Sequence, residues 1–383
     1  MRAEVRNFLR PIKRAVESGW YRACVALLQP ASWVMHLAHR RRAAPRTVLH
    51  LSAMVHVPWQ TTRLLRRQGW RADYLAIGRS PIWDQADFCR VPKSPWWDAF
   101  DEFAWLWSVA SRYQVLHLHF MTTLTRTGWE LRWLKKMGRK VVVHWRGCEI
   151  RDRERNLALH PDINLCEGCE YNPRPCEAPV NVLRRDLARR HGDRVLVTTP
   201  DMLDFAPDAT HLPFFHPESP PPAPRPARAD APMRIVHVTV HPGLEGTEEI
   251  RATVERLQRK GRRIELQVLT WVTPQQVLDA FAVADLAIGK MKMGYYANAQ
   301  IESMAMGVPT ITYVRPELMT DALRGSGFIF STLKDLERTL EHYLDHPEAL
   351  AAKRAIARDS VLRLHDNDAV AGRLAAVYEG LDK

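Results

Sequence analysis

The sequence contains no run of about 18 uninterrupted apolar residues, so a helix that crosses a membrane is not expected. Its first residues carry charges throughout and have no apolar core that ends at a cleavage site, so we expect no secretory signal peptide. No helix-turn-helix or RNA-binding signature accompanies the basic residues, which argues against nucleic acid as a partner. With 46% hydrophobic and 26% charged residues, the 383-residue chain is typical of a cytoplasmic globular protein of two domains.

Acidic residues are scarce at the start of the chain, although the net charge of the whole chain is only +12. Residues 2–46 hold ten lysines and arginines but only Glu4 and Glu17, and the apolar stretch ACVALLQPASWVMHLAH lies between the basic groups. Basic flanks around an apolar helical stretch are typical of a segment that lies on an anionic membrane surface. The alternative is a helix packed on its own domain with a solvated basic face. Residues 1–46 are therefore interpreted as a basic amphipathic segment that makes the protein peripheral at the inner face of the membrane.

Short apolar runs and amphipathic stretches alternate from residue 47 onward. The apolar runs predict strands at 47–52, 73–78, 115–120, 140–145 and 194–199. The amphipathic stretches between them predict helices at 61–69, 97–113, 128–138 and 181–192. Strands separated by helices in this way indicate a parallel sheet covered on both faces. Residues 47–215 are therefore predicted to form a Rossmann-like domain.

A proline-rich segment, residues 216–232, interrupts this alternation with the sequence HPESPPPAPRPARADAP. Prolines fit neither regular element and favour an extended connection, so the segment is interpreted as an interdomain linker. The alternation restarts in residues 233–365, which predict a second Rossmann-like domain, and a closing helix follows in residues 366–383. The predicted fold class is α/β, with two doubly wound parallel-sheet domains that face a cleft.

The segment GYYANAQIESMAMGVPTITYV, residues 294–314, places Glu302 in a short apolar helix that Gly307 and Pro309 end. A carboxylate in such a helix is costly unless hydrogen bonds satisfy it. The segment, together with HVTVHPGLEGTEEI and the aspartate of VADLAIG, resembles the GT-B glycosyltransferases of the retaining family 4 type. The resemblance is best over residues 234–314.

The resemblance implies a site for a nucleotide-diphosphate sugar in the second domain. Glu302 matches the family glutamate that accepts hydrogen bonds from the ribose hydroxyls, and Ser303 follows it in the shared E-S-M-A-x-G-x-P string. The helix begins near Ala297 and Asn298, so its free N–H groups and positive dipole end would face the diphosphate. The alternative is a partly exposed glutamate on an amphipathic helix.

Two positions depart from the family pattern. Gly294 stands where the family has a first glutamate, and Glu245 stands in the loop HPGLEGTEE where a lysine would neutralise the diphosphate. Gly243 of the same loop is included among the candidate donor-binding residues. Lys290 and Lys292 are the candidate replacement cations, although they could equally be solvated loop charges.

Catalytic and acceptor residues are expected from the first domain. The run VLHLHF sets His117 and His119 on one face of a strand, and His119 matches the family histidine that reaches the donor sugar. A strand histidine can also be an ordinary core residue. The segment HWRGCEIR is similar to a family segment that borders the cleft; it contributes His144, Arg146, Gly147 and Arg151. Trp59 is a further acceptor candidate, because tryptophan faces stack on sugar rings and aryl groups.

Four of the six cysteines gather in residues 148–176, namely Cys148, Cys166, Cys169 and Cys176. A C-x-x-C pair with two further thiols gives the count for a closed tetrahedral zinc site, and some family relatives show a similar pattern. We therefore expect a structural zinc ion; an iron–sulfur cluster and free or disulfide-forming thiols are the alternatives. The resemblance implies that no catalytic divalent metal is needed, and the lack of a D-x-D-type metal site in a suitable loop is consistent with this.

The expected function is sugar transfer from a nucleotide-diphosphate sugar to a hydroxyl of a carbohydrate, lipid-linked or small-molecule acceptor. The resemblance implies retention of the anomeric configuration. Two alternatives keep the same fold: a sugar-nucleotide epimerase, and a non-catalytic protein that binds a sugar nucleotide or a partner. The departures at Gly294 and Glu245 are the observations behind the last one.

Overall fold

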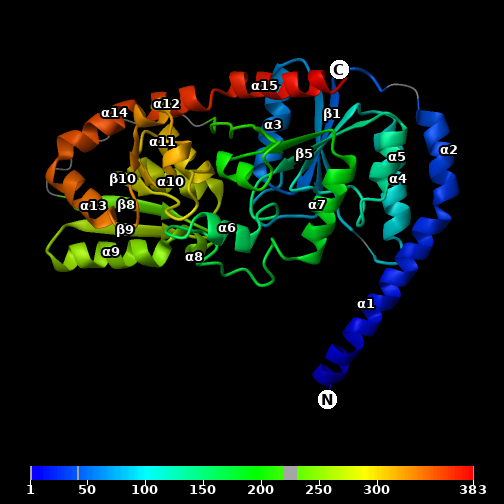
Figure 1. Cartoon of the computed structure of the whole chain (residues 1–383), viewed down its shortest axis with the longest axis horizontal. Coiled ribbons are helices and arrows are strands. Elements are labelled where there is room, and N and C mark those ends of the chain that lie inside the picture. Colours follow the sequence, from blue (N-terminus) through cyan, green and yellow to red (C-terminus); the bar gives the residue numbers. More distant parts are fainter. Residues whose placement is uncertain (1, 41–42, 93, 219–230, 383) are drawn as a thin grey trace. The chain divides into compact units, whose positions relative to one another are not determined.

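The computed structural model describes residues 2–40, 43–92, 94–218 and 231–382 (Figure 1). Within these ranges, no helix combines the length and the apolar character needed to cross a membrane. Internal contacts divide the chain into two compact units. Unit 1 comprises Met1–Trp145, Leu183–Leu196 and Ala375–Lys383, and unit 2 comprises Arg146–Val182 and Val197–Leu374.

The first sheet has seven strands in the order β3-β2-β1-β4-β5-β6-β7. The strands are β1 (Thr47–Ala53), β2 (Arg71–Ile77), β3 (Phe88–Arg90), β4 (Val115–His119), β5 (Lys140–Trp145), β6 (Arg194–Val197) and β7 (Thr210–His211). The central strands β1, β4 and β5 are parallel and almost wholly buried, which explains their continuous apolar sequences. The register pairs His50 with His117 and His119 with His144, so four histidines gather on neighbouring strands.

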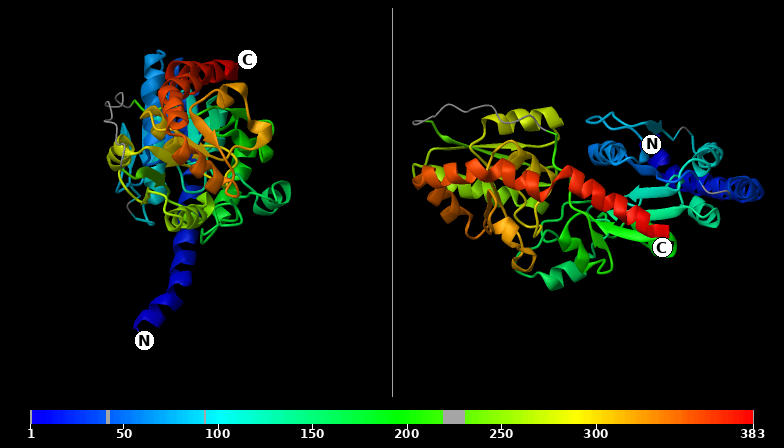
Figure 2. Two further views of the ribbon diagram at one scale, coloured as in Figure 1. Left: turned by 90° about the vertical axis from the view of Figure 1, so that its left-hand side faces the viewer. Right: turned by 90° about the horizontal axis from the view of Figure 1, so that it is seen from above.

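The helices of the first half follow the predicted alternation. They are α1 (Arg2–Leu27), α2 (Gln29–His39), α3 (His56–Arg67), α4 (Asp98–Ala110), α5 (Glu130–Lys136), α6 (Arg153–Leu159), α7 (Pro179–His191) and the 3₁₀ turn η1 (Pro200–Asp204). Helix α3 stops just before Gly69, whose φ of +78° is a left-handed conformation that glycine adopts without strain. In unit 1 the amino-terminal end of α1 extends beyond the strands and the other helices (Figure 2).

The second sheet is parallel and has five strands in the order β12-β11-β10-β8-β9. The strands are β8 (Met233–Val238), β9 (Ile264–Leu269), β10 (Leu286–Ile288), β11 (Thr310–Thr312) and β12 (Phe328–Phe330). Successive residues of β8 enter different core clusters: Ile235 packs with residues of α9 and α13, and Val236 packs with residues of α10. Because side chains alternate along a strand, the sheet is covered on both faces.

The helices of the second half include a long series at the end of the chain. They are α8 (Pro242–Glu245), α9 (Thr247–Arg259), α10 (Pro274–Val283), α11 (Asn298–Ala305), η2 (Pro316–Leu318), α12 (Asp321–Arg324), α13 (Leu336–Asp345), α14 (Pro347–Leu364), α15 (Asn367–Glu379) and η3 (Gly380–Asp382). Helix α11 packs on α14 through a buried cluster that includes Met304, Ala357 and Val361. This packing holds the helix that carries Glu302.

The structure confirms the predicted α/β class with two parallel sheets, and the predicted strands lie where the apolar runs are. Strands β3 and β7 and helix α6 were not predicted; each is short and lacks a clear period. Residues 146–182 and 197–215, assigned by sequence to the first domain, group with unit 2. One reason is that Leu165 and Cys166 pack against Leu244 of α8. Most of the predicted linker, residues 219–230, lies outside the described residues.

Candidate active site

Glu302 lies on α11, four residues after Asn298, and both side chains are partly exposed on the same side of the helix. Gln300 and Ile301, which lie between these two residues in the sequence, are buried. Among the described residues, the Glu302 carboxylate has neither a hydrogen-bond donor nor an ion-pair partner. Burial raises its pKa to about 7 from the ordinary value of 4.5. A ligand that offers hydroxyl donors would therefore remove a cost already present in the fold.

The first turn of α11 supplies N–H groups beside that carboxylate. The N–H of Ala297 donates to Oε1 of Gln300 at 2.8 Å, which fixes the start of the helix. The N–H groups of Asn298 and Ala299 follow at positions where an α-helix offers no carbonyl four residues back. Ser303 is fully buried, and its hydroxyl lies 2.6 Å from Oγ1 of Thr310 in β11, so its side chain serves the packing of the helix on the sheet.

Gly294 owes its residue type to its surroundings. Its φ is +85°, and a Cβ built there would lie 2.7 Å from Cγ of Arg315. The Arg315 side chain is itself almost fully buried and pairs with Asp204 at 2.6 Å. A larger side chain such as glutamate would have no room beside Arg315 at this position.

Lys290 and Lys292 are both engaged by carboxylates of the neighbouring helices. Lys290 pairs with Glu245 of α8, and Nζ of Lys292 lies 2.5 Å from Oε1 of Glu249 in α9. The negative charge of Glu245, which seemed to need a replacement cation, is therefore matched inside the protein. Neither lysine stands as an uncommitted charge beside α11.

Gly243 meets the cysteine-bearing segment at backbone distance. A Cβ on Gly243 would collide with the carbonyl oxygen of Gly168, and a Cβ on Gly168 would collide with that of Gly243. The N–H of Gly243 also donates to Oε2 of Glu170 at 3.0 Å. Both glycines are required by this contact between two main chains. We define the contact of Gly168 with Gly243 as the glycine contact.

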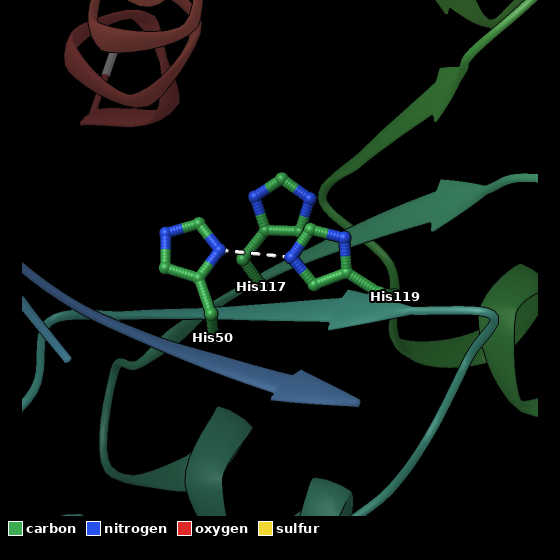
Figure 3. Close-up of side chains that lie close together, drawn as sticks. All are labelled: His50, His117 and His119. Carbon is green, nitrogen blue, oxygen red and sulfur yellow. Dashed lines mark hydrogen bonds between the residues drawn. The ribbon is translucent and has the colours of Figure 1, made fainter. Parts of the chain in front are cut away.

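His119 ends β4 as predicted and is fully buried, together with His50 of β1 and His117 of the same strand (Figure 3). The rings of His117 and His119 stack with centroids 4.3 Å apart and planes inclined by 10°. Nδ1 of His50 and Nε2 of His119 lie 2.9 Å apart, joined by a hydrogen bond. His119 thus belongs to a packed group of imidazoles, and its place at the end of a parallel strand matches the predicted edge of the sheet.

A second set of hydrogen bonds extends this group to β5 and α15. Nδ1 of His117 lies 2.5 Å from the Tyr378 hydroxyl, and Nε2 of His117 lies 3.1 Å from Nδ1 of His144. A neutral imidazole brings one donor and one acceptor. The roles of the three groups are therefore linked: if Tyr378 donates to His117, then His117 donates to His144, and in the reverse case His144 donates to His117 and His117 to Tyr378.

The histidine group is also the one set of three or more potential metal ligands found in the part of the chain that the structure describes. One ring nitrogen from each of His50, His117 and His119 lies within 4.8 Å of the others. The i, i+2 spacing on β4 and the neighbouring strand bring the imidazoles together. Hydrogen bonds between the rings use Nδ1 of His50 with Nε2 of His119, and Nε2 of His117 with Nδ1 of His144.

The loop after β5 is held by its own side chains. The N–H groups of Arg146 and Gly147 both donate to Oε1 of Glu149, at 2.6 and 3.0 Å. The Arg151 guanidinium is buried and bonds Asp201 at 2.5 Å. Burial by itself would lower the pKa of the Arg151 guanidinium, but Asp201 and neighbouring anionic groups raise that pKa above its ordinary value. These residues belong to unit 2, whereas His119, His144 and Trp59 belong to unit 1.

Trp59 lies on α3 and packs against a small core cluster with Met54, Tyr74 and Ala76. Its ring is partly buried, so a good part of its apolar face is already used by unit 1.

The four cysteines of the predicted metal site lie in unit 2 and form no disulfide with one another. Burial raises the pKa of the Cys148 and Cys166 thiols, and a neighbouring thiolate (Cys166 and Cys169, respectively) adds to each shift. Burial likewise raises the pKa of Cys176, which feels both Cys166 and Cys169. Thiols that raise one another's pKa share a small region, and a dication is the natural counter-charge for their thiolates. In the described part of the chain, however, no three of these sulfur atoms lie within 4.8 Å of one another, so zinc binding by the four cysteines stays a prediction.

Sequence reasoning missed several residues that the structure brings to these groups. His50 and Tyr378 join the histidines, and the ion pair of Arg315 with Asp204 lies beside Gly294. His50 could have been found from the predicted pairing of the strand at 47–52 with that at 115–120. Tyr378 lies 261 positions from His117, and no local pattern announces that contact.

No protein-family model matches the sequence, and no curated protein sequence does. Several solved glycosyltransferase structures match in fold. Sucrose-phosphate synthase from Thermosynechococcus elongatus superposes with a TM-score of 0.60 and 14% identity, over 88% of this chain and 99% of that one. HepE from Anabaena, solved with UDP and glucose, gives 0.57 and 11%, over 88% and 100%.

The catalytic domain of starch synthase IV from Arabidopsis thaliana, solved with ADP and acarbose, gives a TM-score of 0.57 and 12% identity, over 88% of this chain and 98% of that one. Identities this low establish likeness of fold. The two parallel sheets and these superpositions together show that the chain has the two-domain α/β fold of GT-B type.

Proposed function

We propose that this chain is a retaining glycosyltransferase of the family 4 type, which moves a sugar from a nucleotide-diphosphate sugar to an acceptor hydroxyl. The observation that carries the proposal is the Glu302 carboxylate, which is only partly exposed to solvent and has no side-chain or backbone partner among the described residues. Two vicinal ribose hydroxyls would satisfy its two oxygens. Structures of the same fold contain UDP in one case and ADP in another, which supports a nucleotide as the ligand.

The proposed chemistry breaks the bond between the anomeric carbon and the diphosphate oxygen, which leaves with the electron pair. The acceptor oxygen forms the new bond on the same face of the sugar, and its proton passes to the departing diphosphate oxygen. Stabilising the leaving charge would be the main task of the protein, and in this proposal the N–H groups at the start of α11 would do so. In this proposal His119 would reach the donor sugar, as the resemblance to family 4 implies.

Further parts of the proposal concern the setting. The acceptor would be a saccharide, a lipid-linked group or a small molecule, in polysaccharide, glycolipid or glycosylated-metabolite synthesis in the cytoplasm. Cys148, Cys166, Cys169 and Cys176 would hold a structural zinc ion. That ion would rigidify the segment and supply no catalytic step.

One alternative has an observation of its own. Lys290 and Lys292 are both committed to carboxylates, and Gly294 offers no side chain, so fewer charged groups are available to a donor than the family pattern provides. This favours a protein that binds a sugar nucleotide without turning it over.

The test begins with thermal shifts of the whole chain in UDP-, GDP- and dTDP-sugars, because a ligand bound only by the folded state raises the melting temperature. The effective donor is then titrated against Glu302→Gln, with Glu255→Gln on the exposed face of α9 as the matched control. We expect at least a tenfold loss of affinity in the first variant and no loss in the control.

Equal affinity in both variants would remove the proposal. Slow hydrolysis of the donor by the wild-type protein supports the enzyme. Binding with no hydrolysis and no transfer to any acceptor supports the non-catalytic alternative.

A further inference from the structure

Helices α1 and α2 present an apolar face to the outside. From Tyr21 to Arg40, buried and exposed positions alternate with the period of a helix. The buried positions are Tyr21, Cys24, Leu28, Ser32 and Met35. The exposed apolar positions, which we define as the outer stripe, are Ala23, Ala26, Leu27, Pro30, Trp33, Val34, Leu37 and Ala38. A helix whose outward face is apolar leaves its largest side chains in water.

Four members of the outer stripe are large and strongly exposed: Leu27 is 73% exposed, Trp33 56%, Val34 53% and Leu37 40%. Isolated surface hydrophobics are common, but a stripe of this length along one face marks a surface that another phase or molecule covers.

The orientation of the stripe is fixed by contacts on the opposite face. The Tyr21 hydroxyl donates to Oε2 of Glu102 in α4 at 2.6 Å, and Nε1 of Trp133 in α5 donates to Oε1 of Gln29 at 3.2 Å. Cys24 and Leu28 pack with Ala99 of α4. These contacts hold α1 and α2 against α4 and α5 (Figure 1), so the outer stripe cannot turn inward without breaking them.

Further exposed aromatic rings lie on the same part of unit 1. Trp20 contacts Trp96 with ring centroids 5.8 Å apart, and both are 44% exposed. Trp97, 67% exposed, contacts Phe100 at 5.8 Å. Indole rings that are apolar yet carry an N–H donor are enriched at membrane–water interfaces.

Cations border the outer stripe. Arg22 and Arg40 are exposed near its two ends. Beside α2, the Arg132 guanidinium and the Lys136 ammonium of α5 lie 5.2 and 4.8 Å from the centroid of the Trp133 ring. The segment from residue 2 to residue 46 adds its excess of ten basic over two acidic residues. Positive charge around an apolar stripe complements anionic headgroups around an acyl layer.

We propose that the outer stripe is the docking surface for a lipid bilayer that contains anionic lipids, with α1 and α2 lying in the interface. Leu27, Trp33, Val34 and Leu37 enter the acyl boundary, and the bordering arginines and lysines meet the headgroups. A second copy of the chain is the other occupant to weigh, but pairing two stripes would bring two basic borders together, and like charges oppose that contact.

The test is sedimentation of the full chain with vesicles of phosphatidylcholine alone or mixed with phosphatidylglycerol, without any nucleotide. Binding is expected on the mixed vesicles, and it should weaken as salt screens the headgroup charges. The double variant Trp33→Ser, Leu37→Ser should lower the partition coefficient tenfold or more. Trp271→Ser, at a tryptophan of unit 2 that is 70% exposed, is the control and should bind like the wild type.

Circular dichroism melts of both variants verify folding, which is expected because the substituted side chains face outward. Equal vesicle binding by the double variant and the wild type would overturn the proposal, as would no binding to either vesicle. A concentration-dependent dimer that Trp33→Ser, Leu37→Ser disrupts would identify a second copy as the occupant and overturn it too. No donor sugar enters the assay, so its outcome is independent of the proposed glycosyl transfer.

Discussion

Glu302 allows a prediction in which folding stability and ligand binding move in opposite directions. Burial holds the pKa of this carboxyl at about 7 in the folded protein, against an ordinary value of 4.5. An acid whose folded pKa is raised binds its proton more tightly when folded, so it lowers stability increasingly as pH rises from about 4.5 to about 7. Glu302→Gln cannot ionise and escapes this loss.

The magnitude follows from the two pKa values. They differ by about 2.5, and each pKa unit is worth about 1.4 kcal/mol, so the full effect is on the order of 3 kcal/mol at pH 8. At pH 5 most of it is absent, and about 1 kcal/mol remains. Glu302→Gln should therefore be more stable than the wild type by an amount that grows by about 2 kcal/mol between these two pH values.

Urea denaturation of both proteins at pH 5 and pH 8, followed by tryptophan fluorescence, measures this difference. The variant should also lose donor binding, because the amide N–H₂ cannot accept a ribose hydroxyl. In the wild type, donor affinity should rise with pH through about 7, since the ionised carboxylate is the form that accepts both hydroxyls. A stability difference that is the same at both pH values would refute the reasoning, because the carboxyl would then have no raised pKa.

Three further predictions follow from the residues around α11 and the cysteines. Gly294→Ala should lower the free energy of unfolding by about 2 kcal/mol or more, because the residue has a positive φ and its Cβ would lie 2.7 Å from the Arg315 side chain. Gly261→Ala is the control: it has a similar φ but open space around the Cβ, so it should cost about half of that. Denaturant melts measure both changes. Lys290→Ala should lower the free energy of unfolding by about 3 kcal/mol in the same assay, because it leaves the buried Glu245 unpaired. Adding Glu245→Gln should restore part of the lost stability. No restoration would mean that the lysine has a purely steric role. Protein purified without chelator should contain about one zinc per chain by elemental analysis, and Cys166→Ser should lower this content severalfold; metal-free wild-type protein would end the zinc proposal.

The sequence predicted the sheets well because parallel strands are buried on both sides and appear as short, continuous apolar runs. The runs at 115–120 and 140–145 became β4 and β5 for this reason. It also located Glu302 on a short helix ended by Gly307, because that stop depends on local backbone chemistry.

Features that depend on distant partners could not be predicted in this way. The pairing of Lys290 with Glu245 joins residues 45 positions apart, so the sequence showed two unexplained charges in place of one ion pair. The sequence also did not determine which face of α1 and α2 is turned outward. Amphipathic spacing says that two faces differ, but only the contacts of Tyr21 and Gln29 with the neighbouring helices decide which face is covered.

The glycine contact has a mechanical consequence. Where Gly168 and Gly243 touch, there is no side chain whose rotation could absorb a displacement, so movement of one main chain must move the other. Gly168 lies between Cys166 and Cys169, and Gly243 lies in the turn that leads from β8 into α8. If the thiols bound an ion or were oxidised, the resulting shift of the cysteine segment would therefore displace that turn directly.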